Sequence, residues 1–111
     1  MTTNDSFRCE VVKSPEDAQG NKVTTIRCHG RLISENTDEI KNVVKPLLPL
    51  GGRIVIDLSD VNYLDSSGLG ALVALKASAV RQGMCILQLE NITPRVLELM
   101  RLTNLAQLLT S

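Results

Sequence analysis

Apolar and polar residues alternate in two segments near the start of the chain. Residues 7–12 and 23–29 place apolar side chains at about every second position, and the second segment is rich in β-branched residues. A period of two is typical of a strand with one buried face. Turn-forming residues fill the intervening segment 13–22, and Gly30 is expected to break the second strand. The pattern therefore predicts an antiparallel hairpin.

Further along, apolar residues recur at the spacing of a helix. The expected helices cover residues from about 37 to 47, from about 67 to 82 and from 94 onwards, with a short helix at 105–109. Gly83 is well placed to end the second helix, and Pro94 suits the first position of the third. Asn104 is a candidate cap for the short helix.

Two continuous apolar runs, 53–58 and 84–89, have the composition of strands that are buried on both faces. Strands that alternate with helices in this way form parallel pairs. The sequence therefore predicts an α/β fold. We expect a mixed, largely parallel sheet of four to five strands, with the N-terminal antiparallel hairpin and helices packed against it. A length of 111 residues indicates one domain, 1–111, with a flexible segment at 1–6.

Charge and composition narrow the possible functions. Lys plus Arg and Asp plus Glu both total 12, so the chain lacks the basic excess of most nucleic-acid binders. Phe7 and Tyr63 are the only aromatic residues, too few for a base-stacking platform. No apolar stretch approaches the length of a membrane span, and the polar first residues do not resemble a signal peptide. We therefore expect a cytoplasmic protein that does not bind nucleic acid directly.

The chain has three cysteines, Cys9, Cys28 and Cys85, and one histidine, His29. Each cysteine lies in an apolar strand segment, and we expect all three to be small, buried, reduced side chains. A site built from Cys28, His29 and a remote cysteine is conceivable, but no spacing matches a zinc motif. We therefore predict no metal and no cofactor.

The segment that most strongly suggests a functional site is the polar stretch 59–66, which is expected to be a loop between a buried strand and a helix. Asp65, Ser66 and Ser67 all suit a helix cap, and capping alone is one explanation for them. However, one cap needs one residue, and Gly68 and Gly70 have no side chain that could cover a serine hydroxyl. Glycine also costs about 0.5–1 kcal/mol per helical position relative to alanine. These features favour a functional serine at the start of the helix.

A serine exposed at a helix start is a good acceptor for phosphate. Phosphorylation adds a charge of about −1.5 to −2, which the helix N-terminus tolerates. Beside the acidic residues Asp57, Asp60 and Asp65, the new charge is expected to repel a docking protein.

These same residues carry a resemblance to a known family. The segments 56–61 and 64–70, which read Ile-Asp-Leu-Ser-Asp-Val and Leu-Asp-Ser-Ser-Gly-Leu-Gly, resemble the signature of anti-sigma factor antagonists. These proteins belong to the STAS domains, named for sulphate transporters and anti-sigma factor antagonists. Gly30-Arg31-Leu32 resembles the earlier strand-to-helix turn of the family, and segments 93–96 and 102–105 resemble its C-terminal helices. The resemblance extends from about residue 7 to residue 109.

The resemblance implies a regulatory function. The unphosphorylated antagonist binds an anti-sigma factor, often a serine kinase, and so releases a sigma factor; phosphorylation ends this binding and a serine phosphatase restores it. Matched residue by residue, the acceptor is Ser67, with Ser66 as the fallback. The expected partner-binding residues are Asp65, Ser66, Gly68, Leu69, Gly30 and Arg31.

Two departures from the family pattern affect these expectations. Ile33-Ser34 stands where many antagonists have an acidic residue, which weakens the transfer of the partner surface near Arg31. The chain also stops at Ser111, where many relatives continue with another strand and helix. An open sheet edge could then accept a partner or a second copy as a weak homodimer, which size-exclusion chromatography would test.

Two other functions compete with the antagonist. A STAS module of another assembly, such as a stress-signalling complex or lipid-transport machinery, would keep the serine motif and bind different proteins. An enzyme with Ser67 as nucleophile would need a base, and His29 is the sole imidazole available. Because nothing completes a triad with His29, we expect that the protein is not an enzyme.

Overall fold

Within residues 7–110, four strands form one mixed sheet in the order β1-β2-β3-β4. The computed structural model describes residues 7–110. The strands are β1 (Arg8–Ser14), β2 (Val23–Leu32), β3 (Gly52–Leu64) and β4 (Cys85–Glu90). β1 and β2 pair antiparallel, whereas β2 with β3 and β3 with β4 pair parallel. The predicted fold class, including the N-terminal hairpin, is confirmed.

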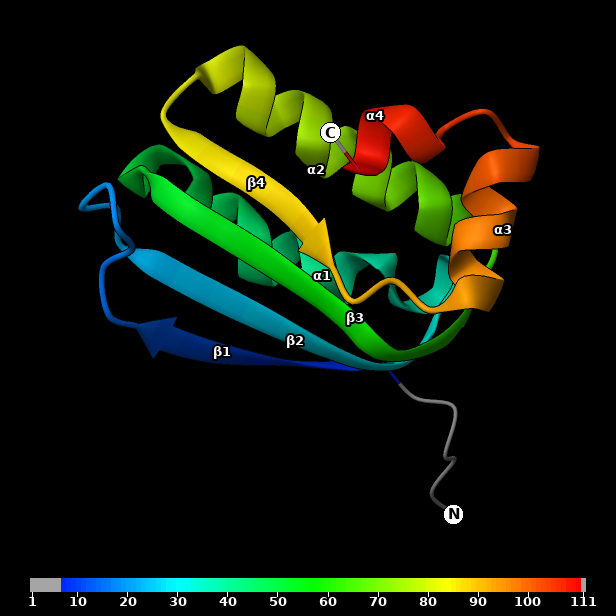
Figure 1. The fold of residues 1–111 in the computed structure, drawn as a ribbon. Coiled ribbons are helices and arrows are strands. Elements are labelled where there is room, and N and C mark those ends of the chain that lie inside the picture. The colour runs from blue at the N-terminus through cyan, green and yellow to red at the C-terminus, as the bar shows by residue number, and fades with distance from the viewer. Residues whose placement is uncertain (1–6, 111) are drawn as a thin grey trace.

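Helices pack against the sheet and supply the other half of the core (Figure 1). They are α1 (Thr37–Val44) between the 3-10 helices η1 (Ser34–Asn36) and η2 (Lys45–Leu50), α2 (Ser66–Gln82), α3 (Pro94–Leu102) and α4 (Ala106–Thr110). α1 and α2 lie behind the strands on one face, and α3 lies beyond the carboxyl ends of β3 and β4. The carboxyl ends of β2 and β3 therefore meet the first turn of α2.

The core lies between the sheet and α2. Ile26, Ile56 and Leu58 from the strands are fully buried, as are Leu72 and Leu75 from α2. Each such side chain contributes about 1.5–3 kcal/mol through removal of apolar surface from water. This packing holds the first turn of α2 in place, because Leu69 in that turn belongs to the same core.

The central strands continue further than the sequence predicts. The segment 59–64, expected as a loop, is the second half of β3, and β2 continues through Gly30 to Leu32. The two extensions pair with each other, and register shifts at Arg27/His29 and Gly30/Arg31 accommodate the irregular backbone. Gly30 takes φ of 102°, a conformation that glycine adopts without steric cost. The strand is therefore irregular at Gly30 but does not end there.

Several helix boundaries also differ from expectation. The α-helix ends at Val44, before the expected end at about residue 47, and residues 45–50 continue as a 3-10 helix that contains Pro46 and Pro49. Asn104 does not cap the last helix; it takes φ of 61° after α3, a left-handed conformation that asparagine tolerates. By contrast, Gly83 caps α2 as predicted, and Thr93 caps α3 by accepting a bond from the Val96 N–H.

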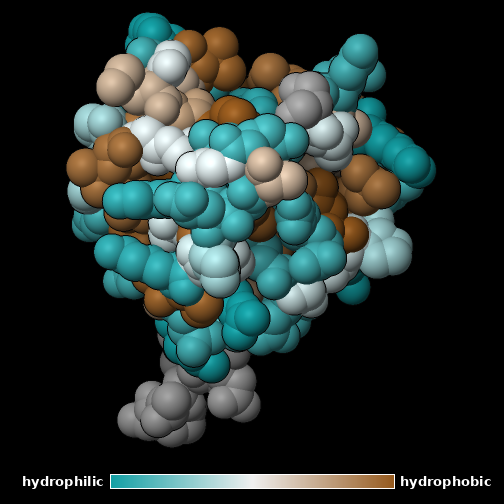
Figure 2. All heavy atoms as spheres, turned by 60° about the vertical axis from the view of Figure 1, so that its left-hand side comes forward, coloured by the Kyte–Doolittle hydropathy of each residue, from teal (hydrophilic) through white to brown (hydrophobic). Residues whose placement is uncertain are grey.

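β4 is one edge of the sheet, as the sequence-based hypothesis of an open edge requires. However, the Lys76 ammonium group of α2 donates to the Leu87 carbonyl oxygen at 2.7 Å. Lys76 is itself buried, and its ammonium group engages one backbone acceptor of β4. The face in Figure 2 also intermingles hydrophobic and hydrophilic residues, without one continuous apolar patch. The homodimer therefore stays a prediction for size-exclusion chromatography.

The segment 1–6, expected to be flexible, lies outside the described residues. Among residues 7–110, none of the helices has the length and apolar character needed to cross a membrane.

Candidate functional site

The first turn of α2 is fixed by one carboxylate. Asp65 has extended backbone angles and caps the helix, and its Oδ1 accepts from the Gly68 N–H at 2.8 Å. Its Oδ2 accepts from the Ser34 N–H at 3.0 Å, just beyond the end of β2. Asp65 therefore joins the β2–η1 turn to the start of α2, a connection that the sequence alone did not indicate.

The same hydrogen bonds favour the ionised form of Asp65. The Gly68 N–H holds the pKa of this carboxyl below its usual value, and the Ser34 N–H acts in the same direction. Stability from Asp65 is therefore present above the usual carboxyl pKa of about 3.9. It is lost as the pH falls through the lower pKa of the folded state.

We expect Asp65→Ala to lower the free energy of unfolding by about 1–2 kcal/mol at neutral pH, because it removes the cap of α2. Asp65→Asn is the matched variant without a titrating group. Urea unfolding from pH 7 to pH 3 should show the difference between wild type and Asp65→Asn shrinking towards acid. A difference that is independent of pH would contradict the assigned role.

Ser66 and Ser67 occupy the first two positions of α2, and both are exposed. Neither hydroxyl has a hydrogen-bond partner among residues 7–110. The helix begins at Ser66 rather than Ser67, because Asp65 is the cap. The expectation of an accessible hydroxyl at the amino end of this helix is confirmed for both serines. Partial positive charge at that end favours an added anion.

The two glycines after the serines have different reasons to be glycine. A Cβ on Gly68 would lie 2.1 Å from the Leu32 carbonyl oxygen, so close packing of α2 on β2 excludes any side chain there. A Cβ on Gly70 would meet nothing within 4 Å. The argument that Gly68 leaves the serine hydroxyl uncovered is therefore wrong, because Gly68 is buried against β2. At Gly70, by contrast, no close contact requires glycine.

A hollow of about 270 Å³ lies beside Ser66, between the start of α2 and α3. Its walls include Tyr63, Leu69 and Leu99, and the hollow is mostly apolar. Leu69, a predicted partner-binding residue, is only 5% exposed. A partner would therefore reach its side chain through this hollow, which Leu69 lines. Tyr63, Leu99 and Thr103 were not predicted, since α3 is distant in sequence from the serine motif.

Gly30 and Arg31, the predicted partner-binding residues of the earlier turn, lie in the last part of β2. The Arg31 guanidinium stacks 4.9 Å from the centre of the Tyr63 ring, its register partner in β3. The Arg31 carbonyl oxygen accepts from the Asn36 side chain at 2.9 Å. These residues are thus adjacent to the serine turn, and Tyr63 connects Arg31 to the hollow.

The other acidic residues expected near Ser67 bind other groups. Asp57 accepts from the Ser59 N–H and the Asn91 side chain, and Asp60 contacts His29. The hydrogen bonds that reach the first turn of α2 come from Asp65 alone among the described carboxylates. Of the three carboxylates expected to make this surface negative, Asp65 is therefore the one that contacts the first turn of α2.

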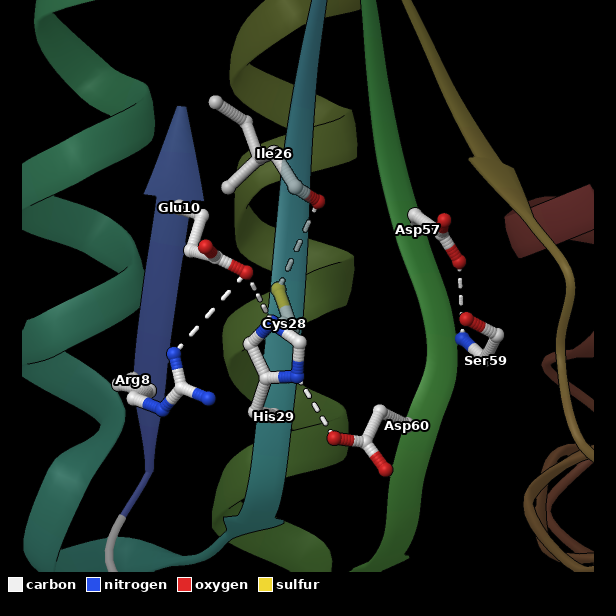
Figure 3. A network of polar contacts seen from close by, with 8 residues as sticks. All are labelled: Arg8, Glu10, Ile26, Cys28, His29, Asp57, Ser59 and Asp60. Atoms are coloured by element: carbon white, nitrogen blue, oxygen red, sulfur yellow. Dashed lines mark hydrogen bonds and ion pairs between the residues drawn. The ribbon is translucent and has the colours of Figure 1, made fainter. Parts of the chain in front are cut away.

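His29 bridges two carboxylates across three strands (Figure 3). Its Nδ1 lies 2.6 Å from Asp60 Oδ2, and its Nε2 lies 2.5 Å from Glu10 Oε1. The Asp60 and Glu10 carboxylates raise the pKa of His29. Both ring nitrogens of His29 are therefore engaged by carboxylates, and neither contacts Ser67 within the described residues.

The His29 bridge predicts a stability change near neutral pH. Its stabilisation is fully present below the usual histidine pKa of about 6.5 and is lost as the pH rises through the raised folded-state pKa. Both carboxylates are more than half exposed, so the effect is expected to stay within about 1 kcal/mol. The unfolding free energy of wild type minus that of His29→Gln, measured from pH 5 to pH 9, should fall across this window. A constant difference would exclude the bridge.

The described residues contain no group of three or more His, Cys, Asp and Glu side chains that could hold a metal ion. All three cysteines are free, but only Cys28 is fully buried, and Cys9 and Cys85 are half-buried. The expectation of three buried cysteines is therefore correct for one of them.

The sequence of the chain matches a family model and a curated protein. A family model described as "MlaB, STAS domain" matches residues 16–110. The anti-sigma-B factor antagonist of Bacillus subtilis is 34% identical over 70 residues, which cover 63% of each chain. The chain thus aligns with less than two thirds of that curated relative.

Solved structures share the fold. An anti-sigma factor antagonist assigned in Thermotoga maritima superposes with a TM-score of 0.72 at 26% identity, covering 90% of this chain and 83% of the other. The Bacillus cell fate determinant SpoIIAA in its phosphorylated form superposes with a TM-score of 0.63 at 19% identity, covering 92% and 86%. At that identity the second likeness shows the fold alone.

Proposed function

The chain belongs to the STAS domain family, and from this membership we propose that it is an anti-sigma factor antagonist switched by phosphorylation of Ser67. In the unphosphorylated state it binds an anti-sigma factor that is also a serine kinase, and so releases a sigma factor. A serine phosphatase reverses the modification. The relatives named as antagonists, from Bacillus subtilis and Thermotoga maritima, support this function.

The observation that carries the proposal is the free hydroxyl of Ser67. It is exposed at the second position of α2 and makes no hydrogen bond within the described chain. A kinase needs such access to a hydroxyl. Ser66 shares these properties, so it remains the fallback acceptor.

The switch acts on binding rather than on the fold. Asp65 already occupies the Gly68 N–H, and a phosphate on Ser67 would add about −1.5 to −2 charge next to that carboxylate. The helix dipole partly offsets the repulsion inside the domain. A docked partner would meet both the bulk and the concentrated negative charge. The hollow beside Ser66 supplies apolar contact area for that partner in the unmodified state.

A second candidate is a STAS module of another assembly, because the matching family model is described as MlaB. Such a module, in lipid-transport machinery or a stress-signalling complex, would use the same α2 start towards different proteins. Pull-down with the intact chain separates the two. An anti-sigma factor of the kinase type supports the antagonist, and transporter subunits support the alternative.

We further propose that the domain itself catalyses no reaction and functions within the cytoplasm. The engagement of both His29 nitrogens by carboxylates supports the first of these statements. Loss of a generic ester hydrolysis activity in Ser67→Ala would overturn it.

The phosphorylation is tested directly by mass spectrometry. Intact-mass analysis after incubation with ATP and a candidate kinase of the anti-sigma type should show one added phosphate, and peptide mapping should place it on Ser67. Ser67→Ala should remain unmodified, whereas Ser66→Ala should be modified like wild type. Modification of Ser67→Ala to the wild-type extent would reject the assignment.

A further inference from the structure

We propose that Cys9 and Cys28 form an oxidisable pair, in which hydrogen peroxide converts two thiols into a disulfide that links β1 to β2. The site is separate from Ser67 and does not depend on the antagonist function. Its basis is the antiparallel register, which places Cys9 directly opposite Cys28.

The spacing of paired strands suits this bond. Directly opposed residues of an antiparallel pair have Cα atoms about 4.5 or 5.5 Å apart, and disulfides span Cα distances of about 4.4–6.8 Å. Both side chains also lie on the same side of the sheet, because Cys28 belongs to the core and Cys9 packs against that core. The cross-link therefore needs only a small approach of the two Cβ atoms.

The two thiols have different properties. Cys9 is half-buried on the edge strand β1, where a small oxidant can reach it, whereas Cys28 is 1% exposed. The Cys28 thiol can donate to the Ile26 carbonyl oxygen at 3.9 Å (Figure 3) or to the sulfur of Cys9. The hydrogen bond between the two thiols lowers the pKa of Cys9. The same bond and the burial of Cys28 both raise the pKa of Cys28. Cys9 is therefore the attacking thiol and Cys28 the resolving thiol.

The chemistry balances without another reactant. The Cys9 thiolate attacks one oxygen of hydrogen peroxide, the O–O bond breaks, and Cys9 sulfenic acid and hydroxide form. The Cys28 sulfur then attacks the Cys9 sulfur, the S–O bond breaks, and the departing hydroxide takes up the Cys28 proton as water. In total, two thiols and one peroxide give one disulfide and two waters. Thioredoxin-type reduction would restore both thiols.

Cys85 provides the internal control. It is half-buried like Cys9, but it lies on β4, at the other edge of the sheet from β1. Burial raises the pKa of its thiol, and no second cysteine faces it in the described chain. Peroxide is therefore expected to leave Cys85 a free thiol under conditions that oxidise the pair.

The test treats the folded chain with hydrogen peroxide, blocks the remaining thiols with iodoacetamide in denaturant, and maps tryptic peptides. Cleavage after arginine and lysine places the three cysteines on separate peptides, 9–13, 28–31 and 82–95. Before the thiols are blocked, we expect the mass of the intact chain to fall by about 2 Da, because two hydrogens are lost. After blocking, the number of alkylated thiols should fall from three to one, and peptides 9–13 and 28–31 should be joined. Dithiothreitol should restore three thiols.

Variants and a denatured sample complete the test. Cys85→Ser should form the link as wild type does, whereas Cys9→Ser and Cys28→Ala should not. Chain treated in guanidinium should give a mixture of all three pairings, because the fold no longer selects one. Preferential loss of the Cys85 thiol, a disulfide between two chains through Cys9, or Cys9 sulfinic acid without a link would each overturn the proposal.

Discussion

Gly68→Ala is expected to destabilise the domain by about 3 kcal/mol, a large part of the stability of a typical small domain. The new Cβ would lie 2.1 Å from the Leu32 carbonyl oxygen, a backbone atom at the end of β2 that has no rotamer with which to move aside. Relief requires α2 to separate from β2. That separation would also disturb the bond between the Asp65 N–H and the same carbonyl, now 3.3 Å long. Chemical denaturation should show the loss as a lower midpoint.

Gly70→Ala is the matched control, two residues further along the same helix. Its Cβ would enter open space, so the substitution should raise the free energy of unfolding by about 0.5–1 kcal/mol through better helix propensity. The pair thus predicts opposite signs for the same change. Equal effects at the two glycines would show that the close contact between α2 and β2 is not as described.

Ser67→Asp is expected to weaken binding of the anti-sigma factor by about 2 kcal/mol or more, roughly 30-fold in Kd, while the domain stays folded. An aspartate at the second helical position interacts favourably with the helix dipole, so stability should be unchanged or slightly higher. Ser67→Ala should bind like wild type, because it removes only an exposed hydroxyl without a partner in the described chain. Titration calorimetry measures each affinity.

Two further variants make the binding result specific. Ala77→Glu adds a negative charge at another exposed position of α2 and should leave binding unchanged. Ser66→Asp tests the fallback acceptor at the neighbouring position. If Ser66→Asp abolished binding and Ser67→Asp did not, the switch would be assigned to the wrong serine.

Much of the fold follows from local patterns in the sequence. The alternation in residues 7–12 and 23–29 was sufficient for the hairpin, and the helical spacing after the serines, with Gly83 at the end, was sufficient for α2. The accessible serines were also predictable, because a run of capping residues before an apolar helix marks a helix start. These features depend on neighbours within a few positions along the chain.

Features that depend on contacts between distant segments were not predictable in this way. The polar residues Ser59, Asp60 and Asn62 indicated a loop, yet pairing with the continued β2 makes them part of a strand. Gly68 has the composition of a flexible or uncovered position, whereas the Leu32 carbonyl oxygen determines it. The opposition of Cys9 and Cys28 likewise needs the register of the hairpin, which single-strand patterns do not fix.

The central claim is that charge added at Ser67 ends the binding of a partner that docks on the start of α2. Its most direct measurement is calorimetric titration of an anti-sigma factor with two samples of the chain, one unmodified and one phosphorylated at Ser67 alone. We predict saturable binding of the unmodified chain and an affinity at least about 30-fold lower after phosphorylation. Equal affinities for the two samples would contradict the account.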